Sequence, residues 1–285
     1  MSSVHIFVTV DDIKAIAPGA DQSLIEDTVR PYLLPAHKIV AAIIGVPLFN
    51  DISEERDTDT RKYLVTAIVN RVMYDYKLFE TVQKRQTGSG DTFKYELQAM
   101  QEAYLGYYFD AIDSLIAELN ASPDTYKEWK QTRAAKTLDS LLLKTTEEFN
   151  ACYGIDSSDY FFFSSIFLQE KVIDKYIAGM DLTTLPEVML RRIKGVVATL
   201  TVAYALRQFD FTMLPRSLRN ASADGAYRHA SSEQNDMYEL SEYLFTQGEA
   251  ELEQIRFALS TPEAGSDMPS ENNLNDPRQK FFLFS

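Results

Sequence analysis

The sequence is poor in the residues that build disulfides, secretion signals and membrane spans. It has 285 residues and one cysteine, Cys152, so no disulfide can form within the chain. Nothing near residue 1 has the basic-then-apolar form of a signal peptide, and we therefore expect an origin in the cytoplasm. Proline, aspartate or lysine interrupts every apolar run before the ~18 residues that a membrane span requires. We expect no membrane segment.

Histidines and nucleotide-binding motifs are also scarce. His5, His37 and His229 lie far apart, and none belongs to an HxxxH or ExxH pair that would place two metal ligands on one helical face. The chain lacks GxSxG, GxxxxGK[ST] and GxGxxG, and the GSG at 88–90 lies between predicted helices rather than after a strand. We expect His37 on a helix surface and Cys152 as an inert buried thiol. The sequence predicts no metal, no cofactor and no enzymatic activity.

Basic residues are outnumbered, with 28 Lys and Arg against 42 Asp and Glu, giving a formal net charge of −14. Neutralising phosphates needs clustered Lys and Arg, so this charge argues against a dedicated nucleic-acid binder. An acidic surface can line a passage through which DNA slides without binding, although a solubilising surface is the simpler interpretation.

A repeated pattern organises what is present. In residues 9–45, Thr9, Asp12 and Ile13 have the same spacing as Thr145, Glu148 and Phe149 in residues 145–179. Each copy then passes through a turn into a predicted helix that stops at a glycine, Gly45 or Gly179. The acidic residues after each threonine favour helix capping over acid–base chemistry, because they would lie at the positive end of a helix dipole.

Apolar periodicity predicts the remaining helices. In the first half these are 10–17, 21–44, 60–85 and 92–120, and in the second half 160–178, 187–209 and 232–259. We expect Pro31 and Pro35 to kink or delay the helix at 21–44, Pro47 to prevent a restart, and 51–59 to form a turn. Ser122 and Pro123 should begin a short helix that carries Trp129. One face of 92–120 recurs at identical spacing in 232–259, comprising Leu97, Met100, Tyr104, Tyr108, Ile112, Leu115 and Leu119, then Met237, Leu240, Leu244, Gly248, Leu252, Ile255 and Leu259.

These patterns predict an all-α protein with minor short β-structure at the termini, built as two tandem helical-bundle modules from an internal duplication. Residues 1–124 form the first module, 125–260 the second and 261–285 an extended tail. The β-capable run at 4–8 is expected to pair with the Phe-rich end of the tail, or that end is expected to pair with a partner's edge. Phe161, Phe162 and Phe163 are read as core rather than as an aromatic binding platform.

Two regions are candidate interfaces. The loops that precede the last helix of each module are locally basic and could contact phosphate or an acidic partner, although solvated loop charges are the simpler interpretation. The tail ends in exposed phenylalanines that are hard to explain as solvent-facing. The interface residues are Lys84, Arg85, Arg216, Arg219, Arg228, Phe281, Phe282, Leu283 and Phe284.

The Thr-x-acid-acid-apolar start, the Asp21, Leu24 and Ile25 opening, Ala36 and the closing Gly45 are similar to the start of head-tail connector proteins of tailed phages. The duplicated form, with TTEEFNACYGI at its centre, resembles a family of structural-region proteins from phages and prophages of gut bacteria. Ordinary head-tail connectors have one such module, whereas this chain has two. The helix that is continuous in them is interrupted here by Pro31 and Pro35.

The resemblance implies a structural adaptor of the virion, made in the host cytoplasm, that forms a homo-oligomeric ring, a dodecamer, in the connector. Its partners would be the portal protein and other connector or tail proteins, with DNA passing nearby. One alternative is a cytosolic helical binding or regulatory protein of a mobile element. The other is a metal-dependent enzyme that uses carboxylates such as Asp57 and Asp59.

Overall fold

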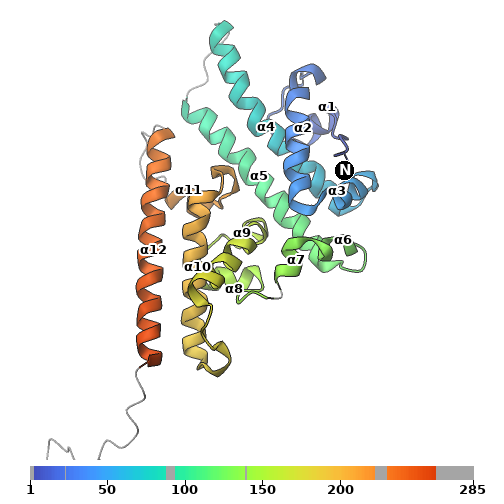
Figure 1. Cartoon of the computed structure of the whole chain (residues 1–285). Coiled ribbons are helices and arrows are strands. Elements are labelled where there is room, and N and C mark those ends of the chain that lie inside the picture. Colours follow the sequence, from blue (N-terminus) through green and yellow to red (C-terminus); the bar gives the residue numbers. More distant parts are fainter. Residues whose placement is uncertain (1–2, 23, 88–93, 139, 222–229, 261–285) are drawn as a thin grey trace, which may run out of the picture.

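The chain is mainly helical in the part that the computed structural model describes, which comprises residues 3–22, 24–87, 94–138, 140–221 and 230–260 (Figure 1). Those residues contain no strand, which confirms the all-α prediction for them. The first half contains α1 (Val10–Ile16), α2 (Glu26–Ile44), α3 (Val46–Glu54), α4 (Asp59–Thr87) and α5 (Lys94–Ala121). The short helices α6 (Lys127–Gln131) and α7 (Arg133–Leu138) lead to the second half.

Helix α1 begins with the predicted capping box. The Thr9 hydroxyl accepts a hydrogen bond from the Asp12 amide at 3.3 Å, and the Asp12 carboxylate accepts one from the Thr9 amide at 2.8 Å. Both bonds satisfy amides that have no partner within the helix. The helix ends before Pro18, as expected.

Residues 4–8 form no strand within the described residues, where side chains of α2 and α3 accept hydrogen bonds from some of their amides. The predicted pairing of this run with 281–284 lies outside the described residues. The amides of Phe7 and Val8 donate to His37 Nε2 at 3.3 and 3.4 Å, and the His5 amide donates to Asn50 Oδ1 at 3.0 Å. His37 is fully buried, so its predicted place on a helix surface is also wrong.

Helix α2 starts later than predicted and ends as predicted. Its N-cap is Ile25, without a capping side chain, while Pro31 and Pro35 lie inside the helix. Gly45 ends it with φ 91°, a left-handed conformation that favours glycine. Helix α3 then starts at once, because Pro47 occupies the first turn, where a missing amide costs no helical bond. The turn predicted at 51–59 is therefore helical up to Glu54.

Helices α4 and α5 pack along each other as a long hairpin, and α1, α2 and α3 pack on α4. The predicted periodic face of α5 is buried from Tyr104 onward. Ser122 and Pro123 form a turn rather than a helix start, since α6 begins only after Tyr126. Trp129 of α6 is buried, and its indole N–H donates to Asn120 Oδ1 at 2.8 Å.

The second half comprises α8 (Thr146–Cys152), α9 (Asp159–Val172), a π-helical turn η1 (Ile173–Ile177), α10 (Glu187–Gln208), α11 (Arg216–Ala221) and α12 (Ala230–Ser260). Two short 3₁₀ turns, η2 (Leu182–Thr184) and η3 (Phe211–Met213), precede α10 and α11. Thr145 caps α8 as predicted, since its hydroxyl accepts from the Glu148 amide at 3.2 Å. The three phenylalanines of α9 belong to the core, as predicted.

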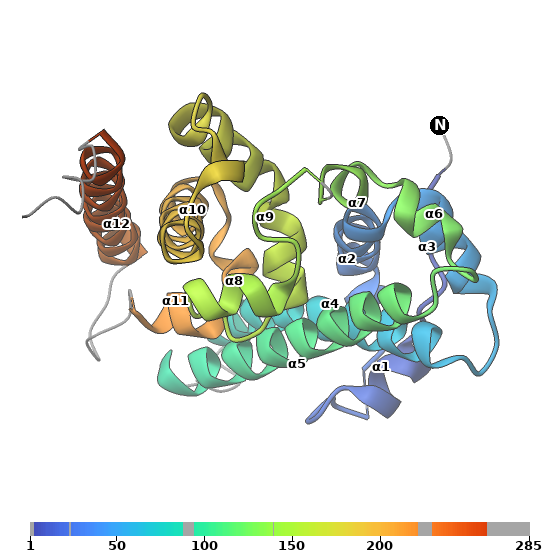
Figure 2. The same ribbon diagram turned by 90° about the horizontal axis from the view of Figure 1, so that it is seen from below.

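Helix α12 packs along α10 and lies at one edge of the molecule in both views (Figures 1 and 2). Gly248 is the contact point, because a Cβ atom there would lie 2.6 Å from Leu200 Cδ2. This close approach explains why a glycine interrupts the bulky series of 232–259. The halves meet where α5 packs against α9.

Candidate functional site

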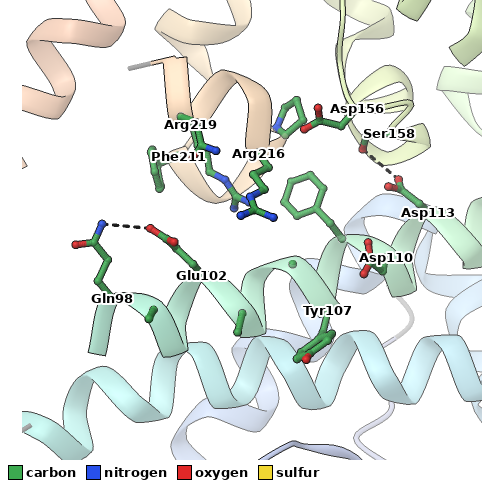
Figure 3. Close-up of a pocket in the computed structure, with 16 residues that line it drawn as sticks. Gln98, Glu102, Tyr107, Asp110, Asp113, Asp156, Ser158, Phe211, Arg216 and Arg219 are labelled. Atoms are coloured by element: carbon green, nitrogen blue, oxygen red, sulfur yellow. Dashed lines mark hydrogen bonds between the residues drawn. The ribbon is translucent and has the colours of Figure 1, made fainter. Parts of the chain in front are cut away.

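A cleft of about 600 Å³ opens where the two halves meet (Figure 3). Its walls are α5, the turn before α9, and the segment formed by η3 and α11. Two predicted interface residues, Arg216 and Arg219, line it. Both lie on α11, a helix within the region predicted to be a loop. Lys84 and Arg85 lie at the end of α4, in agreement with the helix predicted at 60–85, and their side chains are outside the described structure. Arg228, Phe281, Phe282, Leu283 and Phe284 are also outside the described residues.

The turn before α9 positions an acidic residue on the cleft wall. Asp156 and Ser157 both have left-handed backbones, with φ of 56° and 54°. Asn150 Oδ1 holds the turn by accepting from the amides of Ile155 and Ser157 at 2.9 and 3.0 Å. The Asp156 carboxylate then accepts from the Ser217 amide at 2.7 Å, so it caps α11.

Asp113 joins the halves directly. It lies on α5, and its Oδ1 accepts from the Tyr160 amide at 2.7 Å and from the Ser158 hydroxyl at 3.1 Å, at the start of α9. Burial raises the pKa of Asp113 to about 6, against the opposing effect of these two hydrogen bonds. A carboxylate from the first half thus completes the N-terminal cap of a helix in the second.

Arg219 also crosses between the halves. Its side chain is 7% exposed, and its guanidinium lies 5.3 Å from the ring centre of Phe109 and 5.9 Å from that of Phe211. Burial lowers the pKa of Arg219, while the charges of Glu102 and Asp156 act in the opposite direction. Figure 3 shows both arginines of α11 directed toward α5. Arg219 is therefore a buried packing residue, and Arg216 is the exposed arginine of the cleft.

The cleft lining includes neither histidine nor cysteine among the described residues, and the Ser158 hydroxyl donates to the Asp113 carboxylate. Within the described ranges no three His, Cys, Asp or Glu side chains gather as a metal site. Asp59, one half of the carboxylate pair considered above, pairs with Lys62 at 2.9 Å.

Sequence reasoning missed the two aspartates that shape the cleft. Asp113 follows the apolar Ile112 on a helix and carries no motif. Asp156 belongs to a run of turn-forming residues, which indicates a turn but not its hydrogen-bond partner on α11.

Comparison with known proteins gave no match to a protein-family model, a curated protein or a solved structure. Among the described helices, no single one is long and apolar enough to cross a membrane. The pair α2 and α3 passes that test of length and composition only when taken together across a bend of 112°.

Proposed function

We propose that this chain is a structural adaptor of a phage virion that assembles as a ring in the connector between portal and tail. The observation that carries the proposal is a set of exposed aromatic side chains on α12. This helix has 31 residues and packs chiefly on α10, and Tyr238, Tyr243 and Phe257 along its length are more than half exposed. Exposed aromatic side chains along a long edge helix are typical of an assembly surface.

The repeated architecture supports an origin by internal duplication, with modules at 1–124 and 125–260. Each half has a threonine-capped short helix, and each has a helical segment that is followed by a left-handed glycine, Gly45 at φ 91° and Gly179 at φ 92°. Each half also has a long helical hairpin, α4 with α5 and α10 with α12. Duplicated units provide two similar but unequal surfaces, which an adaptor between unlike neighbours requires.

The joint between the halves supports a load-carrying role. Asp113 of α5 caps α9, and Arg219 of α11 packs on Phe109 of α5. These contacts hold the two modules in one orientation. The formal charge of −14 suits a channel through which DNA passes without binding.

The proposed partners are the portal protein, other connector or tail proteins, and further copies of this chain in a dodecamer. The test is the copy number relative to portal subunits in purified particles, measured by calibrated mass spectrometry. We expect a ratio near one. Absence from the particle would overturn the adaptor proposal and favour a cytosolic binding protein.

A further inference from the structure

A second cleft, separate from the one between the halves, lies between α10 and α12 beside the end of α8. Its volume is about 630 Å³. Cys152 at the end of α8 and the following Tyr153 line it, and Tyr243, Leu244 and Gly248 line it from α12. Cys152 is partly exposed, so its predicted burial is wrong. The two long helices that form its walls lie side by side in Figure 2.

Small residues line this cleft. Gly195 of α10 has no atom within 4 Å of the position where its Cβ would be, so the space beside it is open. Gly248 brings the α12 backbone against Leu200, and Ala250 also lines the cleft. The open space beside Gly195 can accept a side chain from another segment.

The cleft is lined by tyrosine, apolar and uncharged polar side chains, and α12 as a whole is acidic. Tyr243 is 59% exposed, and Val196 and Leu244 belong to the same lining. Glu251 and Arg192 also line the cleft and pair with each other at 2.6 Å, so their charges offset each other. Helix α12 contains one basic residue, Arg256, and a series of acidic ones, Glu233, Asp236, Glu239, Glu242, Glu249, Glu251 and Glu253. The complementary ligand is an aromatic segment with basic residues beside it.

One segment of this chain has that chemistry. Residues 278–285 read RQKFFLFS, with three phenylalanines, a leucine, an arginine and a lysine. We propose that this segment of one copy binds the cleft between α10 and α12 of a neighbouring copy. The inference rests on the proposed function and names the contact that would close the ring.

The contact suits a ring because its two surfaces, the segment 278–285 and the cleft between α10 and α12, are different. A segment that enters a neighbour's cleft makes a head-to-tail contact, and such contacts close into rings when the rotation permits. Residues 261–277 separate the segment from α12 and can extend over roughly 55 Å. That reach is sufficient to leave one copy and enter the next.

The first test uses the single native cysteine. Cys152 lines the cleft and is partly exposed, and Leu283→Cys would place a second thiol in the segment. We expect a short bismaleimide to link the full-length variant into a ladder of dimers and larger multiples under denaturing conditions. The control combines Leu283→Cys with Cys152→Ser, which leaves one thiol per chain and must stop at dimers.

The remaining outcomes separate this inference from the proposed function. Cross-linking only within single chains would overturn binding between neighbours. If the Leu283→Cys variant forms rings but no link joins Cys152 of one chain to position 283 of another, the docking proposal is overturned and the adaptor proposal is left intact. Absence of the protein from particles would overturn the proposed function itself.

The second test measures the contact directly. A fluorescent RQKFFLFS peptide is titrated against the full chain with Phe281, Phe282 and Phe284 changed to alanine. We expect saturable binding that weakens at least about tenfold with Tyr243→Ala, a typical loss for an aromatic anchor. Tyr238→Ala, on the same helix outside the cleft lining, should leave affinity unchanged. Equal binding of an RQKAALAS peptide would contradict the proposal.

Discussion

Asp113 is a buried carboxylate. Burial disfavours its ionised form, whereas the hydrogen bonds from Tyr160 and Ser158 favour that form. Its pKa rises from 3.8 to about 6, with burial as the main cause. The folded state therefore holds this proton more tightly than the unfolded state does. Its contribution to the free energy of unfolding is greatest below pH 3.8 and declines as the pH rises through about 6.

Asp113→Asn should remove this pH dependence while keeping an oxygen that accepts from Tyr160. We expect the stability of the variant relative to wild type to increase by roughly 1–3 kcal/mol as the pH rises from 3.8 to about 6. Urea unfolding at several pH values measures the difference. A constant difference across this range would show that Asp113 does not titrate as described.

The contribution of His37 to stability changes with pH in the opposite direction. Burial lowers its pKa below 6.5, and the neutral ring accepts from the amides of Phe7 and Val8. Its contribution to stability is present above pH 6.5 and is lost as the pH falls below that value. We expect hydrogen exchange at these two amides, corrected for intrinsic rates, to accelerate relative to the α5 core on acidification. Unchanged protection would contradict this assignment.

At the scale of the element, the α10–α12 hairpin depends on one glycine. Gly248→Ala places a Cβ atom 2.6 Å from Leu200 Cδ2, and Leu200 is fully buried. We expect a destabilisation of about 1–3 kcal/mol, measured by thermal or urea unfolding. The matched control is Gly195→Ala on the facing helix, which meets no atom within 4 Å and should gain up to about 1 kcal/mol from helix propensity. Equal effects of the two changes would contradict the close contact.

Element type was readable from the sequence wherever local chemistry decides it. The Thr9 and Thr145 caps, the glycine ends and the apolar face of α5 all depend on residues within a few positions of each other. Some of the failures involve distant partners. Within the described part of the chain, residues 4–8 form no strand, and His37 and Asn50 accept hydrogen bonds from amides of this run, which no local pattern shows.

The candidate cleft was only partly predictable for the same reason. Composition drew attention to Arg216 and Arg219, yet the sequence does not show that Arg219 lies under Phe109. Asp113 and Tyr160 are 47 positions apart, and their hydrogen bond exists only because α5 packs against α9.

The prediction that Pro47 prevents a helix restart is wrong because the effect of a proline depends on whether a helix starts directly before it.

At the scale of the whole molecule, the joint should make the two halves unfold together. Asp113→Ala removes a helix cap worth about 1 kcal/mol, and Arg219→Ala removes a buried cation–π contact of about 2 kcal/mol. We expect calorimetry to show one transition for wild type and two for the double variant, with helical content retained at low temperature. A single transition at a lower temperature would contradict this view of the joint.

The cap that Asp113 provides has a consequence for biosynthesis. Helix α5 leaves the ribosome before α9, and the α4–α5 hairpin makes local contacts that form early. We expect the first half, once folded, to present this carboxylate to the first amides of α9 as they emerge. On this expectation the amino-terminal half would act as an intramolecular template for the second half.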